Sequence, residues 1–409
     1  MKILFIAPYM TNNLVPLLSQ CKAGFGYMAY DIARSVAEKQ TVETLLYNYR
    51  YDSFKLGNVH FLGSSWNKFL RNLLQCCSPL MPLKLYCKYH MRMRTFVRIS
   101  YGWLISGYYR EVIRNGHYDV VHIHGCGFMN EFFINICKRQ NIPFVVTLHG
   151  LNSFSDSVKL EHAGKMYEKD FLKVTLEKKY NMTVIASGIK RTILEYFNVK
   201  TADNIHVVNN SFAFNVDCSN VDVRSQYGIP KGAKLVLYVG NISSNKNQEQ
   251  MVRAFTLLPD NWRQQVYILF LGRNNEPGYT IDFLIEQTGY KEHLILCGNI
   301  DKTQISSYYQ EADAVVLLSK AEGFGLSLIE GMNFGIPCMT FTDLDAFEDI
   351  YSQDAVIGIP NREDGTVANS LIEILSSEWS KKGIKNYSKR FDSAAMADNY
   401  INVYKKIQR

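Results

Sequence analysis

Short apolar runs alternate with helix-like patterns along nearly the whole chain. Clear examples of these runs are Lys2–Ala7, Val120–His124 and Phe144–Leu148 in the first half, and Val266–Leu271 and Cys338–Phe341 in the second. Apolar runs of this length, bounded by turn-forming residues, are typical of buried strands, and the longer periodic segments between them are typical of crossover helices. The pattern predicts an α/β fold built on parallel sheets.

A polar stretch near the middle divides this alternation into two halves. Residues 209–231 contain four Asn, three Ser, Gly228 and Pro230 and show little periodicity, so we interpret them as an inter-domain linker. We therefore expect an N-terminal Rossmann-like domain at 1–215 and a C-terminal one at 216–392, with 393–409 forming a helix that crosses back to the first. Ligands of open α/β sheets bind at the carboxyl ends of the strands, which predicts an active site in the cleft between two facing sheets.

Composition excludes several classes of protein. With 409 residues, 47% hydrophobic and 20% charged, the chain has the composition expected of a soluble globular protein. Nine cysteines without a C-x-x-C pair favour reduced thiols over a disulfide framework or a zinc site. The opening MKILFIAPYM is too short for a signal peptide, and no run approaches the roughly 18 apolar residues of a membrane span.

The net charge of +7 is concentrated in residues 66–114. This segment is opposed by Glu111 alone and holds nine basic residues: Lys68, Arg71, Lys84, Lys88, Arg92, Arg94, Arg98, Arg110 and Arg114. Its aromatic residues are Trp66, Phe69, Tyr86, Tyr89, Phe96, Tyr101, Trp103, Tyr108 and Tyr109. Basic and aromatic residues on helices suit an anionic membrane surface or a lipid-linked acceptor. The alternative is a solvated helical hairpin whose aromatic rings belong to the core; nucleic acid is not an expected partner.

The most informative stretch follows the apolar strand Ala314–Leu318. Glu322-Gly-Phe-Gly-Leu-Ser327 predicts a tight loop that opens a helix over Leu326–Asn333. Free N–H groups and the positive end of the helix dipole form a site for a diphosphate there. A loop followed by a helix allows Glu322 and Glu330 to face one ligand, where sugar hydroxyls are their natural partners. The structural alternative is that Glu322 is a helix-start charge and Glu330 a surface residue.

In context, the stretch Glu322–Pro337 resembles the E-x7-E motif of retaining GT-B glycosyltransferases of the group 1 or family 4 class. Further segments resemble elements of this family in the same order: Asp119–His124, Phe144–His149, Ile205–Asn210 and Leu237–Lys246. The resemblance covers the chain from Met1 to about Tyr400, apart from the basic segment. It implies an α/β GT-B fold, in which two Rossmann-like domains face each other across a cleft.

The implied activity is transfer of a hexose-type sugar from a nucleotide-sugar to a glycan or lipid-linked acceptor in bacterial envelope polysaccharide synthesis. A UDP-sugar is favoured and a GDP-sugar is the alternative. The resemblance also implies retention of the anomeric configuration, no metal and no other cofactor. We expect a cytoplasmic protein, peripheral on the inner face of the cytoplasmic membrane if the basic segment binds lipid.

The family's functional positions map onto this sequence residue by residue. His149 and Glu322 would contact the transferring sugar, and Glu330 the ribose. Lys246 and the helix start at Leu326 would hold the diphosphate in place of a metal. The complete set implied for the donor is Gly24, Gly26, Gly240, Lys246, Arg273, Asn299, Ile300, Gly323, Phe324, Gly325, Leu326, Ser327 and Glu330.

One position departs from the family pattern. Asn241 stands where the family usually has an arginine after the strand glycine, and Arg273 is the candidate substitute. Asn299 and Ile300 would face the nucleobase by analogy, and Gly24 and Gly26 would let the backbone approach the donor phosphate.

Several competing motifs are weaker. Gly24-Phe-Gly26 fits a loose G-x-G-x-x-A pattern, but it lies far beyond the first strand and lacks the expected acidic partner, which disfavours a dinucleotide oxidoreductase. Asp343-Leu-Asp345 matches a D-x-D but follows a late strand, so we interpret it as a loop. His122 and His124 lack a nearby third ligand and are expected to be structural. The remaining alternative is a nucleotide-sugar-binding protein or a sugar-nucleotide epimerase on the same fold.

Overall fold

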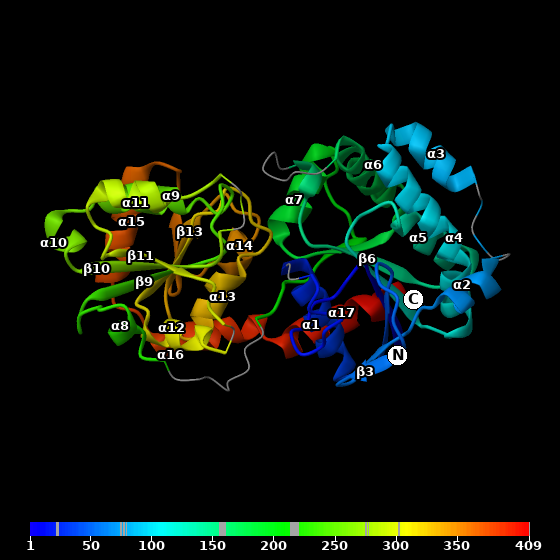
Figure 1. The fold of residues 1–409 in the computed structure, drawn as a ribbon, viewed down its shortest axis with the longest axis horizontal. Helices are drawn as coiled ribbons and strands as arrows, with labels where there is room; N and C mark the ends of the chain where they lie inside the picture. The colour runs from blue at the N-terminus through cyan, green and yellow to red at the C-terminus, as the bar shows by residue number, and fades with distance from the viewer. Residues whose placement is uncertain are drawn as a thin grey trace. The chain divides into compact units, whose positions relative to one another are not determined.

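The computed structural model describes residues 1–21, 24–73, 76, 78, 80–154, 161–212, 221–274, 276, 278–301 and 303–408. The chain divides into two compact units (Figure 1). The N-terminal unit comprises Met1–Ile185, Ile189–Asn209 and Ser393–Arg409, and the C-terminal unit comprises Ala186–Gly188 and Asn210–Asp392. The boundary expected at 215/216 falls outside the described residues.

The N-terminal unit is built on an eight-stranded sheet in the order β3-β4-β2-β1-β5-β6-β7-β8. All its neighbouring strands are parallel except β3 and β4, which form an antiparallel hairpin. The strands are β1 (Lys2–Ala7), β2 (Thr41–Leu46), β3 (Phe54–Leu56), β4 (Val59–Phe61), β5 (Val120–His124), β6 (Phe144–Leu148), β7 (Asn181–Val184) and β8 (Ile205–Val207).

The helices of this unit connect successive strands of the sheet. They are α1 (Gly24–Ala37), α2 (Trp66–Arg71), α3 (Leu80–Tyr89), α4 (Met93–Asn115), α5 (Asn130–Arg139), α6 (His162–Lys178) and α7 (Ser187–Tyr196), with the 3-10 turn η2 at Asn152–Phe154. The last helix of the chain, α17 (Ser393–Ile407), packs against α1 (Figure 1). Its Tyr400 and Tyr404 are buried in one core with Ile3, Phe5 and Ile32.

The C-terminal unit has a six-stranded, all-parallel sheet in the order β11-β10-β9-β12-β13-β14. Its strands are β9 (Lys234–Val239), β10 (Val266–Leu271), β11 (Leu294–Gly298), β12 (Ala314–Leu317), β13 (Cys338–Phe341) and β14 (Val356–Ile359). Its helices are α8 (Val223–Gln226), α9 (Gln248–Thr256), α10 (Asp260–Arg263), α11 (Asp282–Thr288), α12 (Ile305–Glu311), α13 (Leu326–Asn333), α14 (Phe347–Ile350), α15 (Asp364–Ser376) and α16 (Lys381–Ser388), followed by the 3-10 turn η3 (Lys389–Phe391). Counted along the chain, this is the 3-2-1-4-5-6 strand order of a Rossmann sheet.

The apolar pattern predicts the long strands well and the short ones poorly. The expected bounds of β5, β6, β10, β13 and α13 coincide with the observed ones. The β3–β4 hairpin was not expected, because its strands have only three residues each, and β14 was not expected either. Helix α8 lies inside the polar stretch that we interpreted as linker, and Asp222 caps it by accepting a hydrogen bond from the Ser225 N–H. The pattern also predicts a helix over Lys302–Glu311, which is observed as α12; its expected first residue, Lys302, is outside the described residues.

The basic segment 66–114 forms α2, α3 and α4, which gather at one side of the N-terminal unit (Figure 1). Four of its aromatic rings agree with the alternative interpretation, in which the rings belong to the core: Phe69, Tyr89, Tyr108 and Tyr109 are at most 4% exposed. These rings pack in the core because the helices contact the rest of the unit through them. In the described part of the chain, no helix combines the length and apolar character needed to cross a membrane.

Candidate functional site

In each sheet the winding direction reverses at one place, and the predicted site residues gather there. The reversal lies between β1 and β5 in the N-terminal unit, and between β9 and β12 in the C-terminal unit. At such a switch point the loops leave two neighbouring strands in opposite directions, which opens a crevice at their carboxyl ends. His149 lies next to the first reversal, after β6, while Gly240 and the glycine loop lie at the second.

The loop after β12 opens helix α13 in the way the sequence predicts. Gly325 precedes the helix with a φ of 77°, a left-handed conformation that glycine adopts without strain. A glycine has no side chain to cap the helix, so the first N–H groups of α13 are left for another partner. The helix dipole adds positive potential at the same end.

The candidate catalytic carboxylate lies beside the candidate phosphate-binding lysine. The Lys246 ammonium forms a short ion pair with the Glu322 carboxylate, and the Ser319 hydroxyl donates to the same oxygen at 3.2 Å. Both side chains of the pair are largely covered, at 25% and 20% exposed. The loops after β9 and β12 therefore bring together two residues that are 76 positions apart in the sequence.

These two loops are joined by a polar network that the sequence reasoning missed. The Asn245 side chain donates to the Ala321 carbonyl at 2.9 Å and accepts from the Ala321 N–H at 3.2 Å. The buried Tyr238 hydroxyl donates to the Lys246 carbonyl and accepts from the Leu318 N–H, the latter at 2.8 Å. Burial raises the pKa of Tyr238 well above its usual range, so the hydroxyl stays protonated as the bridge requires.

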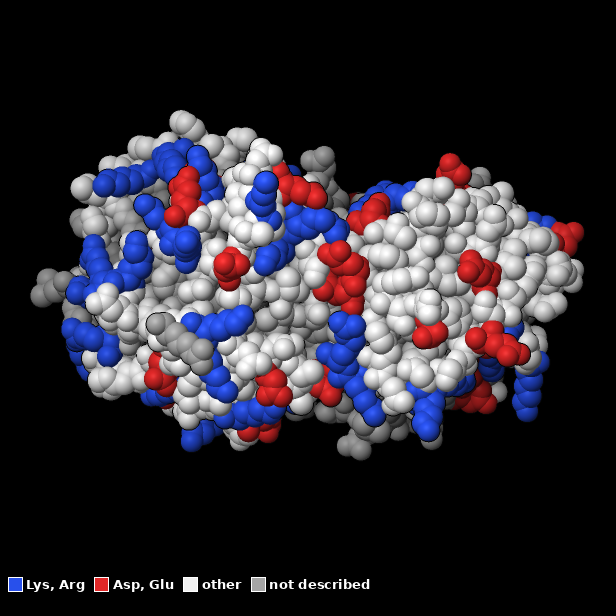
Figure 2. Space-filling model, turned by 180° about the vertical axis from the view of Figure 1, so that it is seen from behind, with Lys and Arg blue, Asp and Glu red and all other residues white. Residues whose placement is uncertain are grey.

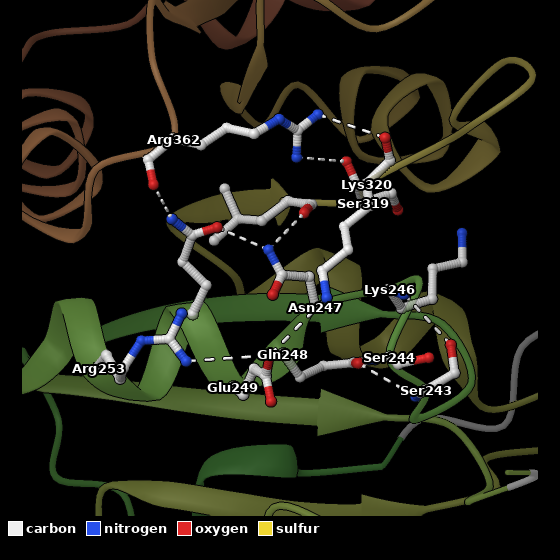
Figure 3. Close-up of polar contacts among 12 residues, drawn as sticks. Ser243, Ser244, Lys246, Asn247, Gln248, Glu249, Arg253, Ser319, Lys320 and Arg362 are labelled. Carbon is white, nitrogen blue, oxygen red and sulfur yellow. Dashed lines mark hydrogen bonds and ion pairs between the residues drawn. The ribbon is translucent and has the colours of Figure 1, made fainter. Parts of the chain in front are cut away.

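Further polar contacts hold the loops after β9 and β12 in place (Figure 3). The Arg362 guanidinium donates to the carbonyls of Ser319 at 3.2 Å and Lys320 at 3.5 Å. Asn247 donates to the Leu318 carbonyl at 3.3 Å, and Gln248 donates to the Asn241 carbonyl at 3.0 Å. In the sequence, one feature points weakly to these contacts: the amide residues Asn245, Asn247 and Gln248 cluster at the start of α9.

The other predicted donor residues lie at the same sheet edge. The Ile242 N–H donates to the Arg273 carbonyl at 2.8 Å, which places exposed Arg273 alongside Asn241, the position where the resemblance leaves an arginine missing. Asn299 and Ile300 follow Gly298, whose carbonyl accepts from the Gly272 N–H at 2.8 Å.

Glu330 lies one turn inside α13. Its carboxylate accepts a hydrogen bond of 2.7 Å from the buried Tyr309 hydroxyl. The side chain is partly exposed, so the ring fixes one oxygen of the carboxylate and orients the group.

In the N-terminal unit, His149 lines a cavity of about 290 Å³ together with Tyr9, Phe25, Tyr47 and Glu168. One ring nitrogen of His149 lies 3.2 Å from Nδ1 of His124, and its Nδ1 has no hydrogen-bond partner among the described residues. A buried polar atom without a partner is costly, so this nitrogen is suited to receive a ligand.

The histidines around this cavity are neutral. Burial lowers the pKa of His149 to about 4 and keeps those of His122 and His124 well below their usual range. His122 is held by the Tyr404 hydroxyl at 2.7 Å and by Thr147, as expected for a structural residue. A neutral His149 can hydrogen-bond to a sugar, and because its ring carries no positive charge it would not repel a sugar that becomes cationic during transfer.

Gly24 and Gly26 lie in the first turn of α1, on either side of Phe25, whose ring makes an edge contact with His149 at 4.8 Å. A Cβ on Gly26 would lie 2.1 Å from the Thr11 hydroxyl, so a glycine is needed there for packing. At Gly24 a Cβ would meet nothing within 4 Å, which leaves its backbone open to a ligand.

Comparison with known proteins identifies the family of the chain. The profile of "Glycosyl transferases group 1" matches residues 221–391, which include Lys246, Glu322 and α13, and that of "Glycosyltransferase Family 4" matches residues 59–212. The chain belongs to the group 1, family 4 glycosyltransferases.

Individual glycosyltransferases are similar over most of the chain. An uncharacterised glycosyltransferase of Methanocaldococcus jannaschii is 22% identical and the match covers 70% of this chain and 75% of that one. The GDP-mannose:cellobiosyl-diphosphopolyprenol alpha-mannosyltransferase of Xanthomonas campestris is also 22% identical, covering 70% and 73%. The structure of Anabaena HepE in complex with UDP and glucose has a TM-score of 0.65 at 16% identity, covering 99% and 100%. The expected GT-B class of this glycosyltransferase is thereby confirmed.

The neutral histidines make the stability of this glycosyltransferase depend on pH. Below pH 6.5 the unfolded chain protonates His149, whereas the folded chain does not until about pH 4, so stability falls with falling pH. We expect this residue to account for about 1.4 kcal/mol per pH unit over that interval. Urea unfolding at pH 7.5 and 5.5 measures it: His149→Gln should lose less stability than the native chain. Equal losses would show that His149 is protonated in the folded state.

Proposed function

We propose that this glycosyltransferase moves a hexose-type sugar from a nucleotide-sugar to a glycan or lipid-linked acceptor in bacterial envelope polysaccharide synthesis. The observation that carries the proposal is the Lys246–Glu322 pair beside the uncapped N-terminus of α13. A diphosphate fits a helix N-terminus with a neighbouring ammonium, and a carboxylate fits the hydroxyls of the sugar attached to it.

The ion pair also suggests how the donor would engage the site. Without a ligand, Glu322 is the partner of Lys246. A bound diphosphate, which carries more charge, would replace the carboxylate as the partner of the ammonium. Glu322 would then be free to turn toward the donor sugar, so that donor binding itself prepares the carboxylate.

The nucleobase of the donor is uracil in a UDP-sugar or guanine in a GDP-sugar. HepE was solved with UDP and glucose, while the Xanthomonas relative is named for GDP-mannose. We favour a UDP-hexose. A melting-temperature screen against UDP, GDP and their sugar conjugates identifies the base, because a ligand at 100 times its Kd stabilises by about 2.7 kcal/mol.

The second candidate function is binding or epimerisation of a nucleotide-sugar without transfer to an acceptor. The cavity lined by His149, whose Nδ1 has no partner among the described residues, favours transfer, because a second substrate has a place to bind there. An epimerase or binding protein would yield no glycosylated product when a mixture of membrane lipids and glycans is supplied with labelled donor.

Lys246→Ala should weaken binding of the nucleoside diphosphate by about 1.5–3 kcal/mol, the range for a charged hydrogen bond. Glu322→Gln should bind it at least as tightly as the native chain, because it removes the competing carboxylate, yet lose most of its transfer activity. Calorimetry and a transfer assay measure both effects. Lys291→Ala is the matched control, since Lys291 is a 73% exposed lysine of the same unit. Unchanged affinity in Lys246→Ala would move the phosphate site elsewhere.

We further propose that transfer needs no metal and retains the anomeric configuration. The Lys246 ammonium and the positive end of the α13 dipole would stabilise the charge of the leaving diphosphate, as a metal ion does in other transferases. Activity should therefore persist in EDTA, and NMR of the product should show the donor's anomer. Loss of activity in EDTA with recovery in manganese would contradict the first statement, and an inverted product the second.

A peripheral position on an anionic membrane is the remaining part of the proposal. Seven of the twelve large hydrophobic side chains exposed in the described chain lie in α2–α4 and the intervening residues: Trp66, Leu70, Leu73, Leu80, Leu83, Met93 and Val97. Exposed basic residues accompany them: Arg71, Lys84, Lys88, Arg92, Arg94, Arg98 and Arg114. In Figure 2, lysine and arginine side chains gather on the N-terminal unit, at the left. Apolar insertion and charge attraction would act together there.

Vesicle sedimentation tests this contact. The full chain should bind anionic vesicles at low salt and release as salt rises. A Leu83→Ser, Val97→Ser variant should bind distinctly less, whereas Leu257→Ser, Phe283→Ser should bind normally, because that control removes equally exposed apolar side chains from the other unit. Equal binding by both variants would leave α2–α4 as an ordinary solvated surface.

A further inference from the structure

A second cavity adjoins the one that contains His149. It has a volume of about 210 Å³ and is formed by the loop after β2 and by α4, with Asn48, Arg98, Tyr101 and Met129 among its lining residues. Tyr47 lines both cavities and so forms the wall between them. The transfer reaction as proposed above uses the first cavity and gives the second no role.

The second cavity is positively charged and has no acid to compensate it. The Arg98 guanidinium donates to the Asn48 side-chain oxygen at 3.3 Å, and no carboxylate of the described residues lies within ion-pair distance of it. Arg50 stacks on Trp66 at 4.0 Å and lies 5.8 Å from the Tyr101 ring centre, so a second guanidinium flanks the cavity. Two basic side chains of this region differ from Arg98 in having acidic partners: Arg92 lies 3.9 Å from Glu161, and Lys88 lies 2.8 Å from Asp170.

Gly102, Met129 and the rings of Tyr47 and Tyr101 line the second cavity and leave room for a group as small as a phosphate. Gly102 lets the Met129 side chain approach closely: a Cβ there would lie 2.3 Å from the Met129 sulfur. Burial raises the pKa of Tyr47, and the positive charge of the nearby Arg98 partly opposes this rise. An arginine offers its donors in a planar fork that matches the oxygens of a phosphate.

We propose that this cavity binds a phosphate group of the acceptor through Arg98, while the acceptor's sugar hydroxyl lies in the adjoining cavity at His149. This rests on the proposed transferase function and adds that the acceptor is a phosphorylated molecule. The phosphate can belong to a lipid-linked sugar or to a water-soluble sugar phosphate. Val97 precedes Arg98 on α4 and is 59% exposed, and an exposed apolar side chain next to the proposed phosphate ligand suits the lipid-linked form.

The test uses the full chain saturated with UDP and titrates two probes, inorganic diphosphate and farnesyl diphosphate. Arg98→Gln should weaken binding of both probes by roughly ten- to a hundredfold. Arg94→Gln, which removes an equal charge one turn away on α4 and outside the cavity, should bind like the native chain. Tighter binding of farnesyl diphosphate than of diphosphate assigns the phosphate to a lipid, and equal binding assigns it to a soluble acceptor.

Two outcomes separate this inference from the proposed function. Equal probe affinity in Arg98→Gln and Arg94→Gln, with UDP binding intact in both, overturns the acceptor site and leaves the transferase proposal standing. If UDP binds neither the native chain nor the two arginine variants, the proposed donor site is overturned instead. The probe affinities of Arg98→Gln and Arg94→Gln, measured without UDP, then still decide whether the cavity binds phosphate.

Discussion

A parallel sheet that reverses its winding opens its strand ends at one place, and both units of this chain have candidate site residues there. The loops that follow β9 and β12 leave the sheet in opposite directions, and the Lys320 N–H joins them by donating to the Asn245 carbonyl at 2.8 Å. The side chains of Tyr238 and Asn245 add further hydrogen bonds across this junction. The position of Lys246 against Glu322, and with it the proposed donor site, depends on this junction.

Tyr238 is the buried centre of this junction, and its hydroxyl both donates and accepts a hydrogen bond. A hydroxyl or amide in a protein interior costs about 1–3 kcal/mol if it lacks a partner, so a network of this kind favours one arrangement of the loops. Arg362 extends the network by holding the Ser319 carbonyl. The donor would therefore meet a preformed phosphate site whose one adjustable contact is the ion pair itself, and a preformed site loses little free energy to reorganisation.

The sequence was sufficient for the long strands, for the helix opened by Gly325 and for the pairing of the glycine loop with a lysine, because each depends on local pattern or on the family motif. It was insufficient where a residue's partner is distant in the chain. Tyr238 appears in the sequence as one more apolar strand residue, and Arg362 as a surface charge. The aromatic rings of α2–α4 illustrate the same limit: burial of Tyr108 and Tyr109 depends on what the helices pack against. The roles of Arg273, Asn299 and Glu330 stay predictions from the resemblance.

The proposed transfer requires that a nucleoside diphosphate binds at the junction of the loops after β9 and β12. Hydrogen exchange of the full chain, with and without the nucleotide that raises its melting temperature most, tests this directly. We expect slowed exchange at residues 241–247 and 323–328, where the backbone N–H groups and Lys246 would hold the phosphates, with little change at β14 and α15. Protection confined to the N-terminal unit, with both loops unchanged while the nucleotide is bound, would contradict it.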